Sequence, residues 1–367
     1  MNAFESLATA GVQRLVPYVP GKPVDELQRE LGLTEIVKLA SNENPLGTGA
    51  KVAAAIQATL PELTRYPDGS GFALKAALSA KLGVEPQQIT LGNGSSEILE
   101  LVARTFLTPE HEVVFSQHAF ALYPILTQAV GAIAKPVPAK DFGHDLDAMR
   151  AAIGENTRLV FIANPNNPTG TLLDSEALEA FIASLPHDVL CVLDEAYYEF
   201  VDPAVRAESL DWPNRYPNLI IARTFSKAYG LAGFRIGYGI SSVDIADLLN
   251  RVRQPFNCNM LALAAAEAAL SDTDYLQQTL AVNHAGMAQL TDAFKALDLP
   301  WIPSSGNFVS VDMKQPAQPI YEALLRKGVI VRPVANYEMP NHLRISIGTE
   351  RENQIFIQAL TEVLQGV

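Results

Sequence analysis

The sequence predicts an α/β protein with a large domain, built on a mainly parallel seven-stranded sheet flanked by helices, and a smaller α+β domain. Two observations lead to this prediction. In the middle of the chain, short runs rich in β-branched residues alternate with amphipathic helical patterns, and strands that alternate with helices form parallel sheets. After residue 273 the alternation stops, and one long helical pattern is followed by a mixture of strands and helices.

Each domain is assembled from elements that the pattern defines. The predicted strands of the large domain are Gln88–Leu91, Glu112–Phe115, Ala134–Val137, Arg158–Ile162, Val189–Leu193, Leu219–Ala222 and Ile236–Gly239, and its clearest helices are Ser95–Phe106, Asp174–Ala183 and Asp244–Arg253. The smaller domain is predicted to contain a helix over Asp274–Leu297, strands near 307–313, 329–334 and 342–348, a helix near Gln318–Lys327 and a closing helix from Glu350. We therefore expect domains at 40–273 and 274–367, with residues 1–39 as an arm that packs on the smaller one.

Composition and charge disfavour several functional classes. The 367 residues are 48% hydrophobic and 18% charged, and the formal net charge is −13. So acidic a chain is a poor partner for nucleic acid, and an anionic ligand would need a local positive pocket. Cys191 and Cys258 are far apart and suggest neither a disulfide framework nor a metal site. No run of residues is typical of a membrane span or a signal peptide, so we expect a cytoplasmic protein.

Loops that follow the predicted strands deserve the closest inspection, because ligands of open parallel sheets bind beyond the carboxyl ends of the strands. The loop after Arg158–Ile162 reads NPNNPTG (164–170), a rigid turn that offers amide groups, among them Asn167. The loop after Val189–Leu193 begins with Asp194, and a carboxylate at the end of a buried strand is costly unless it meets a cation. Taken singly, these features also fit a plain turn and a helix N-cap.

Two further loops carry a lysine and a site for an anion. After Leu219–Ala222 the chain reads TFSKAYG (224–230), with Arg235 close behind; taken alone, this fits a surface lysine at a turn. After Gln88–Leu91 it reads GNGSSEILE (92–100), a glycine turn that opens a helix. Free N–H groups and the helix dipole favour an anion at such a turn. The loop matches neither the dinucleotide-binding pattern nor the P-loop pattern.

Together these loops place an amide, a carboxylate, the phenol of Tyr197 just after Asp194, a lysine, an arginine and an anion site on one rim of the sheet. A cofactor with a phosphate, a basic ring nitrogen and a reactive aldehyde would use every one of them. Pyridoxal 5'-phosphate is such a cofactor, and no metal site is predicted.

The motifs NPNNPTG at 164–170, DEAY at 194–197 and SK at 226–227, with Arg235, resemble those of the fold-type I, aspartate-aminotransferase-like family. The resemblance covers essentially the whole chain, and the motifs keep the family's order and spacing. It implies that Lys227 is the catalytic residue, which binds the cofactor aldehyde covalently and then shuttles a proton. It also implies that Asp194 pairs with the pyridine nitrogen. The other implied cofactor contacts are Asn167 and Tyr197 at the phenolate oxygen, and Gly94, Ser95, Thr224, Ser226 and Arg235 at the phosphate.

The resemblance extends to two aromatic residues. Phe120, in SQHAFALY (116–123), is expected to stack on the cofactor ring, with ordinary core packing as the alternative. Tyr66, in RYPDGSG (65–71), is expected to reach the cofactor phosphate of a neighbouring subunit, with a plain turn tyrosine as the alternative. If Tyr66 does so, the site is complete only in a homodimer.

Residues outside the large domain bear on the substrate. Arg344, in LRISIGT (343–349), resembles the arginine that binds the α-carboxylate in many aminotransferases, and Arg332 adds a second guanidinium that suits a dianionic phosphate. With PYVPGKP (17–23) and ASNENPL (40–46), these motifs resemble the histidinol-phosphate aminotransferases. The implied reaction converts L-histidinol phosphate and 2-oxoglutarate to imidazole acetol phosphate and L-glutamate. Tyr18 either closes over the pocket or packs against the arm, and the roles of Asn42 and Asn44 stay open.

Three other functions fit parts of this pattern. An aromatic-amino-acid aminotransferase would use the same cofactor and could use Arg344 for a carboxylate. A phosphothreonine decarboxylase-like enzyme would keep the cofactor and change the reaction. A cofactor-binding regulatory module would need an attached DNA-binding domain, for which the chain has no spare length or basic face. The motifs favour the histidinol-phosphate reaction over all three.

Overall fold

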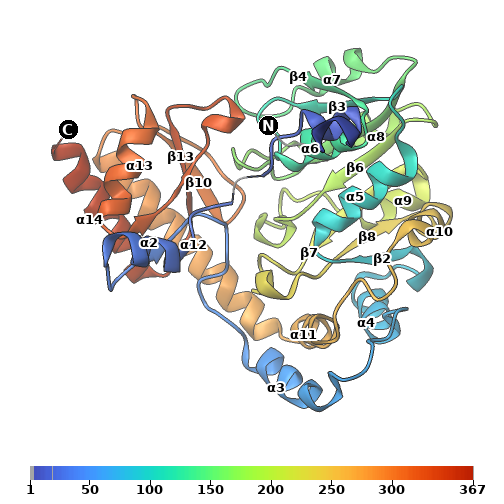
Figure 1. The fold of residues 1–367 in the computed structure, drawn as a ribbon, viewed down its shortest axis with the longest axis horizontal. Coiled ribbons are helices and arrows are strands. Elements are labelled where there is room, and N and C mark those ends of the chain that lie inside the picture. Colours follow the sequence, from blue (N-terminus) through green and yellow to red (C-terminus); the bar gives the residue numbers. More distant parts are fainter. Residues whose placement is uncertain (1–3, 19, 367) are drawn as a thin grey trace.

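The computed structural model describes residues 4–18 and 20–366. It contains a seven-stranded sheet, a four-stranded sheet and a two-stranded sheet. We call the seven-stranded sheet with its helices the large part, and the four-stranded sheet with the last three helices the small part. The two parts lie side by side, and the long helix α12 runs from the small part toward α11 (Figure 1).

The large sheet has the strand order β2-β8-β7-β6-β5-β3-β4. Its strands are β2 (Ile89–Gly92), β3 (Glu112–Ser116), β4 (Ile133–Val137), β5 (Thr157–Ala163), β6 (Leu190–Asp194), β7 (Leu219–Thr224) and β8 (Gly237–Ser241). Only β8 runs antiparallel to its neighbours, whereas the pairs from β7 across to β4 are parallel. The prediction of a mainly parallel seven-stranded sheet is therefore confirmed.

Helices cover both faces of this sheet, because its central strands are apolar on both sides. Along β5, Phe161 packs into the core formed with α5 (Ser95–Phe106), α6 (Leu122–Ala129) and α10 (Val243–Val252). Its neighbours Val160 and Ile162 pack into the opposite core. That core is formed with α3 (Ala50–Thr59), α4 (Phe72–Leu82), α7 (Leu146–Ala152), α8 (Ser175–Ala183), α9 (Trp212–Arg215) and α11 (Met260–Leu270).

The small part is an antiparallel sheet of order β12-β13-β10-β9. Its strands are β9 (Trp301–Ile302), β10 (Phe308–Asp312), β12 (Arg332–Pro333) and β13 (His342–Ser346), and its helices are α12 (Thr273–Ala296), α13 (Ala317–Arg326) and α14 (Glu350–Gln365). The predicted strand near 329–334 is split in two. Its first half, β11 (Val329–Ile330), is not part of the four-stranded sheet and pairs with β1 (Val37–Lys38) instead. The sequence pattern does not indicate β1, which has two residues. The short 3-10 helices are η1 (Glu5–Leu7), η2 (Leu60–Glu62), η3 (Pro86–Gln88), η4 (Tyr198–Phe200), η5 (Ser209–Asp211), η6 (Ala232–Phe234) and η7 (Ala335–Tyr337).

The N-terminal arm contacts the small part, on which we expect it to pack, and also the large part. Helix α2 (Val24–Leu31) places Leu27 against Ile330 of the small part. Helix α1 (Ala10–Gln13) instead lies on α6 of the large part, where the side-chain amide of Gln128 donates to the carbonyl of Gly11 at 3.1 Å. A Cβ at position 11 would collide with the backbone of Gln128, so glycine allows this close approach. Within the described residues, no helix has both the length and the apolar character that crossing a bilayer requires.

Candidate active site

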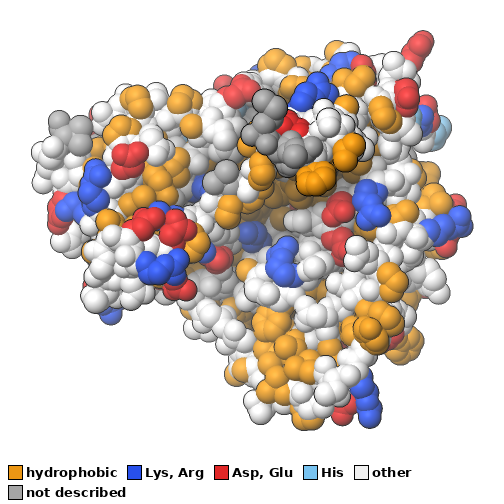
Figure 2. All heavy atoms as spheres, in the orientation of Figure 1, with side chains coloured by type: hydrophobic (Ala, Val, Ile, Leu, Met, Phe, Trp, Pro, Cys, Tyr) orange, Lys and Arg blue, Asp and Glu red, His pale blue; other side chains and the backbone are white. Residues whose placement is uncertain are grey.

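A pocket opens where the carboxyl ends of β5, β6 and β7 face the small part. The surface is hollowed between the two parts, and Lys and Arg side chains show at this hollow (Figure 2). Twelve of the fourteen predicted site residues line the pocket: Tyr18, Ser95, Phe120, Asn167, Asp194, Tyr197, Thr224, Ser226, Lys227, Arg235, Arg332 and Arg344. The other two, Gly94 and Tyr66, do not line it, although Ser95 next to Gly94 does.

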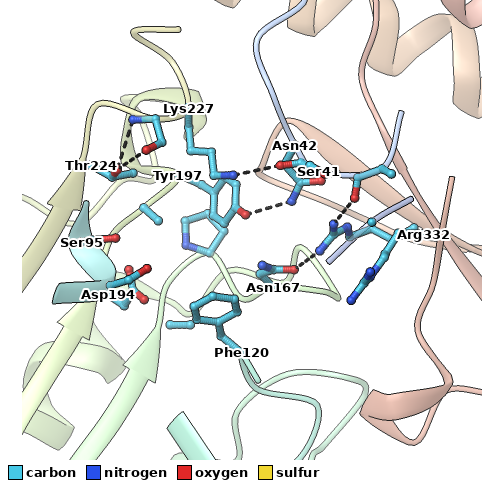
Figure 3. Close-up of a pocket in the computed structure, with 18 of the residues that line it drawn as sticks. Ser41, Asn42, Ser95, Phe120, Asn167, Asp194, Tyr197, Thr224, Lys227 and Arg332 are labelled. Atoms are coloured by element: carbon cyan, nitrogen blue, oxygen red, sulfur yellow. Dashed lines mark hydrogen bonds between the residues drawn. The ribbon is translucent and has the colours of Figure 1, made fainter. Parts of the chain in front are cut away.

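Lys227 stands just beyond the end of β7, with its ammonium group turned into the pocket. Its Nζ donates to the backbone carbonyl of Ser41 at 3.1 Å (Figure 3). Burial, followed by the positive charge of Arg344, lowers the pKa of the amine to about 8. A substantial fraction of the amine is therefore neutral near pH 7 to 8, which a nucleophilic lysine requires.

Asp194 ends β6 with its carboxylate buried at the pocket wall. One carboxylate oxygen accepts from the hydroxyl of Tyr123 at 3.0 Å, whereas the other has no partner among the described residues. Burial raises the pKa of this group to about 6. A buried carboxylate oxygen without a partner is expensive unless a ligand supplies a donor or a cation, so this oxygen fits a protonated ring nitrogen.

Tyr197 and Asn167 offer hydrogen-bond donors on the same rim. The side-chain amide of Asn42 donates to the Tyr197 hydroxyl at 2.9 Å. Burial raises the pKa of Tyr197 to about 12, so the phenol keeps its proton at neutral pH. The Oδ1 of Asn167 accepts from the guanidinium of Arg344 at 2.6 Å, which leaves the amide N–H2 of Asn167 as its donor group.

The start of α5 and the turn after β7 form the expected anion site. Arg235 donates to the Ser226 hydroxyl at 3.3 Å, and the Ser226 amide donates to the Thr224 hydroxyl at 3.1 Å. Gly94 has a φ of +78°, and a Cβ there would collide with the Arg235 guanidinium. Glycine at position 94 thus lets the guanidinium approach the first turn of α5, which begins at Ser95 and whose free N–H groups favour an anion.

Arg332 and Arg344 sit directly opposite each other on β12 and β13. The Arg344 side chain is only 6% exposed, its two terminal nitrogens donate to Asn167 Oδ1 and to the Ala40 carbonyl at 2.6 Å each, and its Nε has no partner among the described residues. Arg332 lies 5.6 Å from the ring centroid of Tyr18, on the arm. This pair is suited to a ligand that carries two negative charges.

The two aromatic expectations have different outcomes. Phe120 lines the pocket, where its ring is half-buried. Tyr66 is 80% exposed and stacks on Phe256, with 4.7 Å between the ring centroids, away from the pocket of its own chain. Its contact with a neighbouring subunit stays a prediction.

Sequence reasoning singled out the motif that contains residues 40–42 but left its role open between orienting the arm and lining the pocket. Ala40, Ser41 and Asn42 all line the pocket, and Asn44 instead ties the loop to Ala228 and Thr279. The two asparagines of the motif were its only sequence feature that pointed to a function. Their contacts with residues far away in the sequence show what they do in the structure. Among the described residues, no three His, Cys, Asp or Glu side chains form a group that could hold a metal ion.

The pocket residues fit pyridoxal phosphate, as judged from the unpartnered oxygen of Asp194 and the space that Gly94 leaves for Arg235. Asp194 would hold the ring nitrogen, Asn167 and Tyr197 the phenolate oxygen, and Ser95, Ser226 and Arg235 the phosphate. Lys227 is the one amine in the pocket lining that could bind the aldehyde.

Comparisons with known proteins agree with this geometry. The family model described as "Aminotransferase class I and II" matches residues 34–360. Histidinol-phosphate aminotransferase 1 of Nitrosococcus oceani is 62% identical over 99% of this chain and 98% of its own length. Histidinol-phosphate aminotransferase 2 of Pseudomonas aeruginosa is 61% identical over 99% of both.

Solved structures are similar over almost the whole chain. The crystal structure of histidinol-phosphate aminotransferase from Sinorhizobium meliloti in complex with pyridoxal-5'-phosphate superposes with a TM-score of 0.90 at 32% identity, and covers 98% of this chain and 97% of its own. The aspartate aminotransferase of Thermus thermophilus with maleate has a TM-score of 0.84 at 22% identity, over 97% of this chain and 99% of its own. The second likeness shows a shared fold.

Proposed function

Because the chain belongs to the class I and II aminotransferases, and among them to the histidinol-phosphate aminotransferases, we propose that it transfers the amino group of L-histidinol phosphate to 2-oxoglutarate. The products are imidazole acetol phosphate and L-glutamate, and the reaction belongs to histidine biosynthesis. The observation that carries the proposal is the pair Arg332 and Arg344, opposite each other at the rim of a pocket that also contains Lys227 and Asp194.

The two arginines can serve both halves of the reaction. Histidinol phosphate has a phosphate and no carboxylate, so its dianion would lie against both guanidinium groups. Glutamate has no phosphate, so its α-carboxylate would use the same place in the second half. A single pair of cations therefore explains how one pocket accepts two dissimilar substrates.

Pyridoxal phosphate, when bound, supplies an electron sink that accepts the charge left on the substrate carbon when a proton is removed. Lys227 removes and returns that proton through Nζ, for which a pKa of about 8 is well placed. Asp194 would keep a proton at the ring nitrogen through the carboxylate oxygen that has no partner among the described residues. Tyr197 remains a neutral donor to the phenolate oxygen, because burial raises its pKa to about 12.

We propose that the protein is a cytoplasmic homodimer. In this dimer, Tyr66 of one copy reaches the cofactor phosphate of the other. Support comes from a pair of exposed aromatic side chains. Tyr66 and Phe256 stack on each other and are 80% and 44% exposed, and large exposed apolar side chains that lie together often mark an interface. Light scattering would test the dimer, and Tyr66→Ala should weaken cofactor binding only in the dimeric form.

A single half-reaction tests the substrate. The protein is loaded with pyridoxal phosphate and mixed with L-histidinol phosphate or L-phenylalanine, and the visible absorbance of the bound cofactor is followed by stopped flow. Faster conversion by histidinol phosphate supports the proposal. Equal or faster conversion by phenylalanine favours the aromatic-amino-acid alternative, and conversion by neither rules out both amino donors. Lys227→Ala serves as the control that binds substrate without converting it.

A further inference from the structure

Three consecutive residues each contact a different functional group of the pocket. The carbonyl of Ala40 accepts from Arg344 at 2.6 Å, and the carbonyl of Ser41 accepts from Lys227 at 3.1 Å. The side-chain amide of Asn42 donates to the hydroxyl of Tyr197 at 2.9 Å (Figure 3). We call residues 40–42 the bridging segment, because the small part supplies the first of these partners and the large part supplies the other two.

The orientation of the Asn42 side chain is fixed by the small part. Its Oδ1 accepts from the Ser346 hydroxyl at 3.0 Å, so its N–H2 must face Tyr197. Its backbone N–H donates to the same hydroxyl oxygen at 2.8 Å, and its carbonyl accepts from Asn307 at 3.0 Å. The residue is 1% exposed and has a φ of +54°, a backbone conformation that asparagine tolerates better than most residues.

This contact decides where the Tyr197 proton points. A phenol oxygen that accepts from an amide N–H has its own O–H left to donate elsewhere. Tyr197 is 3% exposed and lines the pocket, and its ring packs edge-on against Phe308 with 5.0 Å between centroids. With the ring fixed by Phe308 and the oxygen fixed by Asn42, the remaining direction for the proton is into the pocket.

We propose that Asn42 is a positioning residue that orients the Tyr197 hydroxyl proton toward the phenolate oxygen of the cofactor. Because Asn42 is hydrogen-bonded to Ser346 of the small part, this orientation depends on the packing of the small part against the pocket. The inference rests on the cofactor site of the proposed function, and it adds a residue that acts through Tyr197. It does not depend on which amino donor the protein uses.

The test is the midpoint of the pH titration of the cofactor's visible absorbance in the holoenzyme, with no substrate present. A donor at the phenolate oxygen opposes uptake of the proton that this titration measures, so loss of the donor raises the midpoint. Asn42→Gly keeps the backbone conformation available and removes the amide. We expect it to raise the midpoint by about one pH unit, the size expected for a hydrogen bond to a charged group.

A mutant cycle separates positioning from a general structural role. In a Tyr197→Phe background, Asn42→Gly should cause no further rise, because the group on which Asn42 acts is gone. Ser346→Ala, which frees the Asn42 amide, should raise the midpoint in the same direction by a smaller amount. Ser241→Ala is the control. It removes a comparably buried hydroxyl at the end of β8, where Ser241 pairs with Ile220 near the start of β7 and so lies at the edge of the sheet opposite the pocket, and it should leave the midpoint unchanged.

Two outcomes overturn the inference: an equal rise in both backgrounds, or no rise in the wild-type background. If Asn42→Gly does not fold or bind the cofactor, Ser346→Ala in the two backgrounds decides the question in the same way. A wild-type holoenzyme that does not convert histidinol phosphate, yet shows this pattern of midpoints, would refute the proposed substrate and leave the role of Asn42 standing. Conversion of histidinol phosphate without this pattern of midpoints would support the proposed substrate and refute the role of Asn42.

Discussion

Replacing Lys227 by methionine should stabilise the protein while abolishing its catalysis. The pKa of this lysine falls from 10.5 to about 8 in the folded protein, through burial first and then through Arg344. Lys227 therefore binds its proton more tightly in the unfolded chain than in the folded protein. At every pH below about 8, the burial of the charged amine lowers the free energy of unfolding. The unfavourable contribution fades as the pH rises from about 8 to 10.5 and is absent above that window.

The magnitude follows from the two pKa values. A change of one pKa unit corresponds to 1.36 kcal/mol, so a drop from 10.5 to about 8 costs about 3 kcal/mol at pH 7 and less than about 1 kcal/mol at pH 10. Lys227→Met also removes the hydrogen bond to the Ser41 carbonyl and adds an apolar group, but these effects do not depend on pH. The variant's gain over the wild type should thus shrink by about 2 kcal/mol between pH 7 and pH 10.

Urea denaturation of the cofactor-free proteins at pH 7 and pH 10, at one protein concentration, measures this difference. Lys295→Met, at an exposed lysine near the end of α12, is the matched control and should show the same change in unfolding free energy at both pH values. The reasoning is refuted if the free-energy difference between Lys227→Met and the wild type is the same at pH 7 and pH 10. It is equally refuted if the difference grows as the pH rises.

Three further predictions concern the ligands. Asp194→Asn should weaken pyridoxal phosphate binding about 10- to 100-fold, measured as the dissociation constant, since a charge-assisted hydrogen bond to the ring nitrogen is lost; an unchanged constant would count against that pairing. Arg332→Ala should raise KM for histidinol phosphate about 10- to 100-fold and affect phenylalanine less, whereas equal losses would make Arg332 structural or carboxylate-binding. Gly94→Ala should displace the Arg235 guanidinium and weaken cofactor binding, and it should also lower the melting temperature, because a φ of +78° is strained for alanine; an unaffected dissociation constant would remove Arg235 from the phosphate site.

The large sheet and most of the pocket could be predicted because their signals are local. Buried parallel strands are continuous apolar runs, and a polar residue that ends such a run stands out, as Asp194 does after LCVL and Lys227 does beyond LIIART. Parallel strands share one carboxyl edge, so these residues meet without any knowledge of side-chain packing. The sequence pattern therefore predicted the site more completely than it predicted the boundaries of the short strands in the small part.

The parts that escaped prediction depend on contacts between distant segments. Strand β1 has two residues and exists because β11 lies beside it, and no periodicity can appear in so short a run. Asn42 takes its role from Ser346 and Tyr197, 304 and 155 residues away. The helix α1 packs on α6 because Gly11 admits a close backbone contact, and one glycine in an arm gives no indication of its partner.

The arrangement of charge in the pocket links substrate binding to proton transfer. Lys227, Arg235, Arg332 and Arg344 line it together with one carboxylate, that of Asp194, in a chain whose net charge is −13. After burial, the charge of Arg344 is the largest factor that lowers the pKa of Lys227. A substrate anion against Arg344 offsets that charge, and the pKa of Lys227 then rises. The charge of Arg344 thus favours the neutral, nucleophilic amine, and a substrate anion that offsets this charge favours the amine that takes up the proton from the substrate carbon.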